Sequence, residues 1–222
     1  MSKEIKEKES MFSPKNMRLI VNPLNKENPV TVQVLGICSA LAVTVKFEPA
    51  FMMAISVTAV AAVGNYIISA MRNTIPSRIR IIVQLVVIAT LVILVDQLLK
   101  AFSYDVSKQL SVFVGLIITN CILMGRYEAY AMANKPWPSF LDGLGNGFGY
   151  GMILLLIAAF REIFGSGTLT LPGIGQVPII PHVFYEMGYK NNGMAILPPM
   201  ALIAVASIIW IQRSRNKDLQ ED

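Results

Sequence analysis

The chain has 222 residues, of which 54% are hydrophobic and only 15% are charged, against about 25% charged residues in an average soluble domain. A soluble fold of this length cannot bury so much apolar surface, and the apolar residues form runs long enough to cross a bilayer. The net charge of +5 comes from Lys and Arg in the tails and short loops, which fits membrane topology and argues against a nucleic-acid partner.

Six apolar runs predict an all-α membrane domain over residues 30–212, between cytoplasmic tails of residues 1–29 and 213–222. Residues 1–10 are rich in alternating Lys and Glu and have no apolar core, so we expect no cleavable signal peptide. The breaks in the first half lie at Glu48-Pro49 and around Pro76. The six transmembrane helices are predicted at residues 30–45, 50–71, 79–99, 110–124, 144–164 and 194–212.

The basic residues predict that both tails lie in the cytoplasm, because Lys and Arg are retained on that side of short loops. With six crossings and both tails inside, about three quarters of the 19 Lys and Arg residues fall on the cytoplasmic face. Each half would then contain three crossings, so two halves that share a fold would form inverted three-helix repeats, a plan common in transporters.

The first helix of each half is short and carries an interior glycine and a cysteine. Gly36 and Cys38 lie in the first half, and Gly115 and Cys121 lie in the second. Short, glycine-interrupted helices at matching positions of two halves are typical of a binding site near the membrane midplane, because broken helices expose unpaired backbone groups. We therefore expect helices 1 and 4 to be interrupted and to border the site.

Cys38 and Cys121 are the only cysteines, a number that excludes a disulfide-rich secreted fold. Thiolate sulfur binds iron-sulfur clusters and soft metals, so both residues are candidate metal ligands and would supply half of a four-thiolate site. Two other interpretations stay open. A free cysteine often packs as a small buried hydrophobe, and the two residues could instead form a disulfide. No Cys-x-x-Cys spacing distinguishes these interpretations.

Two carboxylates near the ends of predicted helices, Asp96 and Asp142, are candidates for an ion path, because a charge placed in a membrane is costly and is usually functional. The alternative for Asp96 is an ion pair with Lys100, one helical turn later. The alternative for Asp142 is a role as the N-cap of the helix that follows it.

Glycine occupies every second position from Gly143 to Gly151. The spacing does not match the G-x-G-x-x-G pattern of dinucleotide-binding loops, and no strand precedes it. Within a helix the same residues form overlapping G-x-x-x-G pairs, which allow another backbone to approach closely. The run therefore predicts close helix packing.

Five strings resemble the D subunits of sodium-translocating NADH:quinone oxidoreductases, whose family also includes the E subunits and the membrane subunits of Rnf-type complexes. The longest is KQLSVFVGLIITNCILMGR at residues 108–126. The others are VQVLGICSALAV, RIIVQLVVIATLVILVDQ, PSFLDGLGNGFGYG and REIFGSG, and the resemblance extends over about residues 28–167. Cys38 and Cys121 lie within GICSA and TNCIL, where the family has its cysteines.

The resemblance implies a sodium-transporting, electron-relaying subunit of a bacterial inner-membrane enzyme that oxidises NADH and reduces quinone. It also implies a homologous E subunit in the opposite orientation, with two cysteines from each subunit holding a [2Fe-2S] cluster or iron. NADH, flavins and quinone would be bound elsewhere in the complex, by its A, B, C and F subunits. The alternatives are an inverted-repeat secondary transporter without redox chemistry and a scaffold subunit with structural cysteines.

Overall fold

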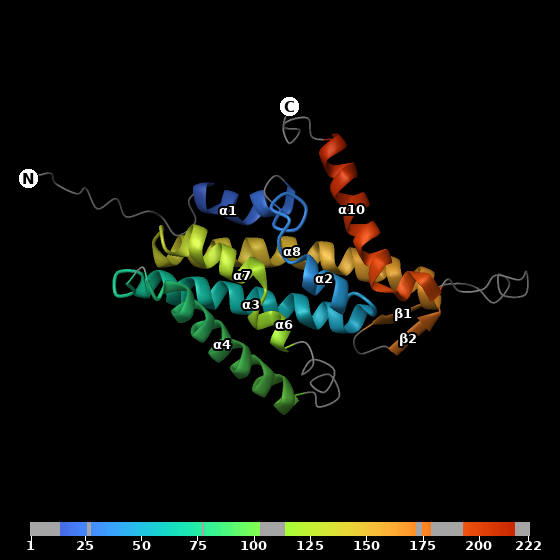
Figure 1. Ribbon diagram of the computed structural model, residues 1–222, viewed down its shortest axis with the longest axis horizontal. Coiled ribbons are helices and arrows are strands. Elements are labelled where there is room, and N and C mark those ends of the chain that lie inside the picture. The colour runs from blue at the N-terminus through green and yellow to red at the C-terminus, as the bar shows by residue number, and fades with distance from the viewer. Residues whose placement is uncertain are drawn as a thin grey trace, which may run out of the picture.

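The computed structural model describes residues 14–25, 28–76, 78–102, 114–171, 175–178 and 193–215. The described residues are mostly helical, as predicted, with one antiparallel pair of short strands (Figure 1). The helices are α1 (Pro14–Asn25), α2 (Ile37–Val43), α3 (Phe47–Met71), α4 (Arg80–Phe102), α6 (Val114–Ile118), α7 (Cys121–Arg126), α8 (Pro136–Ser166) and α10 (Pro198–Arg215). The remaining elements are the π-helical turn η1 (Tyr127–Ala131), strands β1 (Thr168–Leu171) and β2 (Gly175–Pro178), and the 3-10 turn η2 (Gly193–Ile196).

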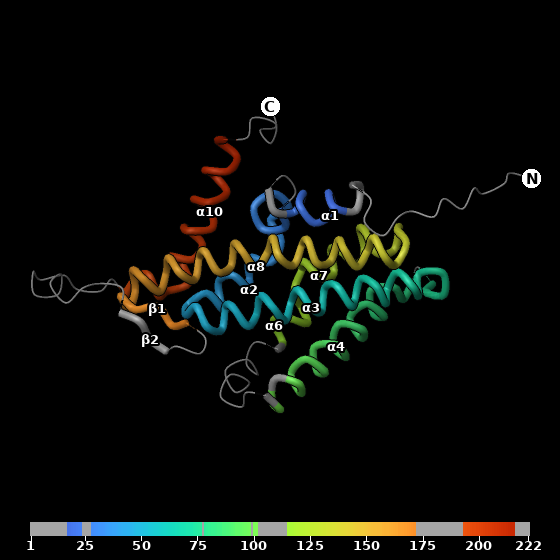
Figure 2. The backbone as a smooth tube through the Cα atoms, turned by 180° about the vertical axis from the view of Figure 1, so that it is seen from behind, coloured from blue at the N-terminus to red at the C-terminus, as the bar shows by residue number. Residues whose placement is uncertain are grey.

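Helices α3 and α8 run side by side and form the most extensive contact in the molecule (Figures 1 and 2). Glycines on α8 allow their backbones to touch. A Cβ added at Gly147 would lie 2.7 Å from the Thr58 Cα, and one added at Gly143 would lie 2.6 Å from the Ala61 carbonyl oxygen. The predicted close packing through G-x-x-x-G pairs is therefore confirmed.

Helix α1 packs on a second glycine face of α8. A Cβ added at Gly145 would lie 2.5 Å from the Leu19 carbonyl oxygen, and one added at Gly149 would lie 2.6 Å from the Pro23 carbonyl oxygen. The Asn28 side-chain amide also donates a hydrogen bond to the Gly149 carbonyl oxygen at 3.2 Å. Part of the predicted N-terminal tail is therefore a helix that packs along the core.

The predicted helix over residues 30–45 is wrong in its first half, because helical backbone begins only at α2. The Asn28 carboxamide oxygen accepts hydrogen bonds from the backbone N–H groups of Val30 at 3.0 Å and Thr31 at 3.3 Å. This Asx turn competes with a helix for those donors. Gly36 then adopts a left-handed conformation, with φ of 77°, directly before α2.

The predicted helix over residues 110–124 is divided into α6 and α7. This break is the interruption that was predicted for helix 4. Its residues 110–113 lie outside the described chain. After α6 the chain turns at Thr119, and the Asn120 side chain caps α7 by accepting a hydrogen bond from the Ile122 backbone N–H at 3.2 Å. The helix then continues through η1, beyond the predicted end at residue 124.

The other boundaries shift because proline is tolerated in the first turn of a helix, where its missing N–H has no intrahelical partner. Helix α3 begins at Phe47 and contains Pro49, which was predicted to lie in a break. Helix α8 begins at Pro136 instead of residue 144. The predicted helix over residues 194–212 starts with η2 and continues as α10, which begins at Pro198.

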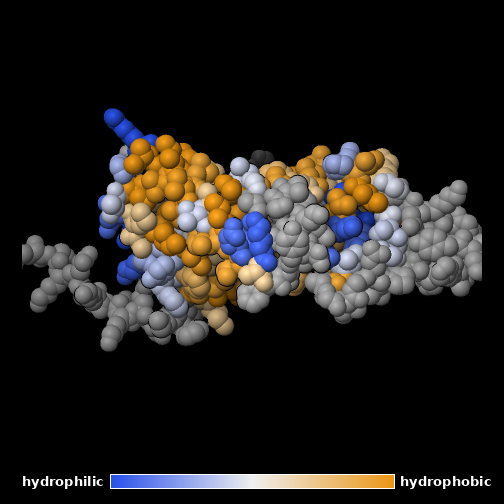
Figure 3. All heavy atoms as spheres, turned by 90° about the horizontal axis from the view of Figure 1, so that it is seen from below, coloured by the Kyte–Doolittle hydropathy of each residue, from blue (hydrophilic) through white to orange (hydrophobic). Residues whose placement is uncertain are grey.

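Three of the described helices, α3, α4 and α8, are long and apolar enough to cross a membrane. Many large apolar side chains on α4 are exposed. Examples are Ile82, Val86 and Leu98, each at least half exposed. Figure 3 views the molecule from the side on which α4 lies, and the described residues on this side are largely hydrophobic. Such a surface suits lipid or a partner helix better than water.

Gly147→Ala should destabilise the fold by about 1–3 kcal/mol, because the new methyl group would collide with α3 backbone, which has no room to rotate away. Gly115→Ala is the matched control, since a Cβ added there meets nothing within 4 Å. Thermal unfolding of the purified protein in detergent measures both. Equal unfolding temperatures for the two variants would contradict the close packing of α3 and α8.

Candidate functional site

The fold brings the two cysteine-bearing segments together. Cys38 is the second residue of α2 and Cys121 is the first residue of α7. A Cβ added at Gly36, just before α2, would lie 2.6 Å from the Cδ1 atom of Ile122 in α7. The starts of these two short helices, 84 positions apart in the sequence by residue number, are thus in direct contact.

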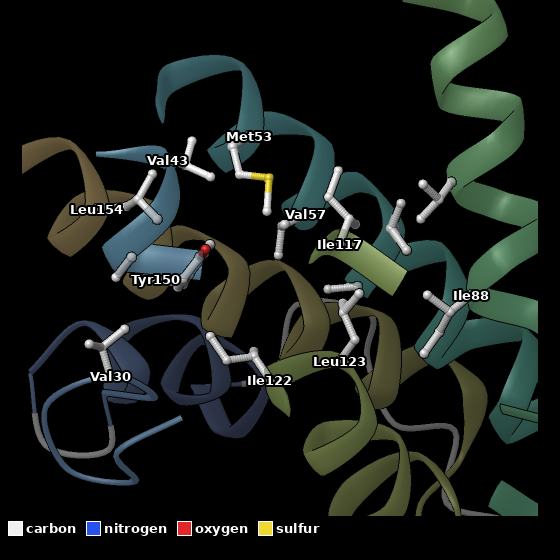
Figure 4. Packing of buried hydrophobic residues seen from close by; sticks show 14 of the residues in the cluster. Val30, Val43, Met53, Val57, Ile88, Ile117, Ile122, Leu123, Tyr150 and Leu154 are labelled. Carbon is white, nitrogen blue, oxygen red and sulfur yellow. The ribbon is translucent and has the colours of Figure 1, made fainter. Parts of the chain in front are cut away.

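A buried polar cluster joins the two segments behind the cysteines. The Tyr150 hydroxyl donates a hydrogen bond to the Ser39 Oγ at 2.7 Å, and the Asn120 side-chain amide donates to the same oxygen at 3.5 Å. Ser39 follows Cys38 directly, and Asn120 directly precedes Cys121. All three polar side chains are fully buried, and Figure 4 shows Tyr150 in the same buried cluster as Ile122.

Both thiols are free and exposed on the surface of the chain. In the isolated chain, Cys38 and Cys121 are therefore neither buried nor joined in a disulfide. Among the residues that the structure describes, no group of three or more His, Cys, Asp and Glu side chains is placed to hold a metal ion. The two exposed thiols suit half of a tetrathiolate metal site, the other half of which would come from a partner.

Asp142 lies inside α8 and not at its start, so the N-cap interpretation is wrong. Its carboxylate is buried and forms a two-point ion pair with Arg126, whose Nε donates to Oδ2 at 3.0 Å and whose terminal amine contacts Oδ1. The Asn146 side chain donates to the same Oδ1 at 3.1 Å. This ion pair ties the end of α7 to α8.

Asp96 forms the alternative contact predicted for it, an ion pair with Lys100 at 2.6 Å. The Asp96 side chain is only 12% exposed, whereas that of Lys100 is 43% exposed. The second carboxylate oxygen of Asp96 has no hydrogen-bond partner within the described part of the chain. Asp96 lies on α4 and Asp142 on α8, and no described contact joins the two carboxylates.

Arg161 is a buried charged residue that was not among the candidate site residues predicted from the sequence. Its guanidinium is fully buried and donates to the Ala195 carbonyl oxygen at 3.1 Å, the Ile196 carbonyl oxygen at 2.5 Å and the Thr44 hydroxyl at 2.6 Å. The ion pairs formed by the described residues do not include Arg161. Arg161 therefore joins the end of α2 to η2 through neutral oxygens.

Glu162 was also missed, although a charged pair inside the apolar run AAFREIF was a signal for it. Its carboxylate is buried and accepts hydrogen bonds from the Phe47 backbone N–H at 2.8 Å and the Thr170 backbone N–H at 2.9 Å. Phe47 is the first residue of α3. Glu162 thus caps α3 and anchors β1 to the end of α8.

Comparison with known proteins agrees with this arrangement. Residues 16–209 match the family described as "Rnf-Nqr subunit, membrane protein". The chain is 53% identical over 204 residues to the D subunit of the Na(+)-translocating NADH-quinone reductase of Tolumonas auensis, a match that covers 92% of this chain and 93% of that one. It is 55% identical over 199 residues to the D subunit of the same enzyme from Aeromonas hydrophila, covering 90% and 92% of the two chains.

A third relative, the D subunit of the Shewanella loihica enzyme, is 54% identical over 197 residues, and the match covers 89% of this chain and 91% of that one. These matches span nearly the whole described chain, including both cysteine-bearing segments and all of α3, α4 and α8. The chain belongs to the Rnf-Nqr family of membrane protein subunits.

Proposed function

We propose that the chain is the D subunit of a sodium-translocating NADH:quinone oxidoreductase and that it holds half of an intramembrane iron centre. The observation that carries this proposal is the pair of exposed thiols, Cys38 and Cys121, on two adjoining short helices. High identity to subunits of that name over nine-tenths of the chain supports the assignment to the complex.

Two thiolates cannot complete a four-coordinate iron site, so a partner must supply the rest. A homologous E subunit in the opposite orientation would present its own two cysteines to Cys38 and Cys121. The centre would be a [2Fe-2S] cluster or iron, and it would relay electrons one at a time across the membrane. NADH, flavins and quinone would be bound in the other subunits of the complex (A, B, C and F).

The membrane arrangement that we propose has six crossings in two inverted repeats, each beginning with a broken segment that is followed by a long helix. Segments α2 and α3 would correspond to segments α7 and α8. Cytoplasmic tails would flank the domain of residues 30–212 at both ends, with the outer residues 1–13 and 216–222 beyond the described chain. The chain would lie in the bacterial inner membrane with both termini inside.

Cys38→Ala and Cys121→Ala should each remove the iron from the intact complex, because each deletes one proposed ligand. Reduction of the flavin nearest NADH should persist, whereas electron delivery to the downstream flavins and quinone should stop. The measurements are iron content, acid-labile sulfide and stepwise flavin reduction. Thr119→Ala is the matched control, since this exposed hydroxyl near Cys121 donates only to the Gly115 carbonyl oxygen at 3.0 Å.

A structural cysteine would behave differently, because Cys→Ala removes a single sulfur atom and should cost on the order of 1 kcal/mol of stability. An assembled Cys38→Ala or Cys121→Ala complex with full iron and normal quinone reduction would contradict the ligand assignment. That result would favour a transporter or scaffold role.

We propose that Asp96 and Asp142 lie on the sodium path, because carboxylate oxygens suit a hard cation. Asp96→Asn and Asp142→Asn should raise the sodium concentration needed for half-maximal quinone reduction. Asp142→Asn should also destabilise the protein by about 3–5 kcal/mol, since it leaves the Arg126 charge without its buried partner. Asp96→Asn should cost no more than about 1 kcal/mol, because the side chain of its partner Lys100 is 43% exposed and water can solvate the charge left behind.

Glu128→Gln is the control for both variants, because Glu128 is an exposed carboxylate paired with Arg80 at 2.5 Å. It should leave the sodium dependence unchanged. If assembled Asp96→Asn and Asp142→Asn complexes keep the normal sodium dependence, the two residues do not lie on the sodium path and form only structural ion pairs.

Reporter fusions should place both termini and the loop between α3 and α4 in the cytoplasm. The loop contains Arg72 and Arg78, and Arg80 is the first residue of α4. Such positive charges are retained on the cytoplasmic side. A fusion at the C-terminus that reports the periplasm would mean an odd number of crossings. That outcome would contradict the six-helix arrangement.

A further inference from the structure

The hydroxyl of Tyr150 belongs to the buried hydrogen-bond cluster that joins the two cysteine-bearing segments. It donates to the Ser39 Oγ at 2.7 Å, and the Ser39 hydroxyl in turn donates to the Gly36 carbonyl oxygen at 2.9 Å. The Asn120 amide reaches the same Ser39 oxygen from the other segment at 3.5 Å. Every polar side chain in this cluster is buried, so water cannot replace a lost contact at low cost.

Each cysteine is exposed while its neighbours in the sequence are fixed. Cys121 lies between Asn120 and Ile122, both fully buried, and Cys38 directly precedes the buried Ser39. The positions of the two sulfur atoms therefore depend on the anchored backbone on either side of them. Tyr150, on the long helix α8, is the rigid point to which that backbone is attached.

We propose that Tyr150 is a positioning residue for the iron site, which acts through Ser39 to set the spacing and orientation of Cys38 and Cys121. This inference rests on the proposed function, in which those thiols hold iron. Groups behind metal ligands orient them, and losing such a group typically lowers metal affinity about 10–100-fold. Tyr150 acts through one intervening residue, so we expect an effect at or below the lower end of that range.

Tyr150→Phe tests the proposal, because it removes the hydroxyl but keeps the ring. The ring itself supports the turn before α2, since a Cβ added at Gly36 would lie 3.2 Å from the Tyr150 Cε2 atom. Tyr127→Phe is the matched control. Tyr127 is also fully buried, and its hydroxyl donates at 2.9 Å to the Val60 backbone carbonyl oxygen, which lies on α3 and on neither cysteine-bearing helix.

The measurements are made on the purified multi-subunit complex: iron content, the rate of iron release to an added chelator, and the electron paramagnetic resonance spectrum of the centre. Tyr150→Phe should release iron roughly 5- to 10-fold faster and should change the spectrum. Ser39→Ala should reproduce both changes, and combining it with Tyr150→Phe should add nothing, because the two residues act as one link. Tyr127→Phe should match the unmodified complex.

Iron release and spectra in Tyr150→Phe that equal those of Tyr127→Phe would overturn the inference. If Tyr150→Phe fails to assemble, Ser39→Ala decides the question from the other end of the same hydrogen bond. The two proposals fail in different ways. Full iron in Cys38→Ala overturns the iron site and this inference together, whereas loss of iron in Cys38→Ala with no effect of Tyr150→Phe or Ser39→Ala overturns the inference alone.

Discussion

Backbone contact between α3 and α8 underlies the other features of this fold. A membrane offers little hydrophobic driving force between helices, so stable association depends on close packing and on hydrogen bonds. Because of its glycines, α8 has two faces without side chains. One of these faces contacts α3 and the other contacts α1. With side chains in place of Gly147 and Gly143, the neighbouring backbones would be held apart, and the buried polar contacts along α8 would not reach their partners.

Those polar contacts make α8 the support for both broken segments. Asp142 pairs with Arg126 at the end of α7, and Tyr150 bonds to Ser39 at the start of α2. Arg161 bonds to the end of α2 near the far end of α8. Both short helices, which lack the length to be stable alone, are thus held at defined places along one long helix. The proposed iron site depends on this arrangement.

Much of this could be predicted from the sequence. Apolar runs identified the long helices, and the alternating glycines indicated close packing, because both patterns act through local composition. The start of α2 was misplaced because an Asx turn at Asn28 replaces helical hydrogen bonds, and side-chain competition of that kind leaves no trace in hydropathy.

Tertiary partners were harder to predict. The burial of Arg161 was missed because two of its hydrogen-bond acceptors are carbonyl oxygens from a segment more than 30 residues away in the sequence, and no side-chain pattern encodes them. Asp142 was identified as unusual, but its pairing with Arg126 depends on how η1 and the following turn bring the first part of α8 to the end of α7. The hydrogen bond from Tyr150 to Ser39 likewise depends on how the fold places α2 against α8.

In the proposed iron site, Cys38 and Cys121 supply half of the four thiolates and a partner subunit supplies the rest. X-ray absorption at the iron edge, measured on the intact complex, tests this arrangement most directly, because it reports which atoms surround the metal. The account predicts iron whose protein ligands are all sulfur, and a loss of that signal when either cysteine is replaced. An iron site surrounded by nitrogen and oxygen, or a fully active complex without iron, would contradict it.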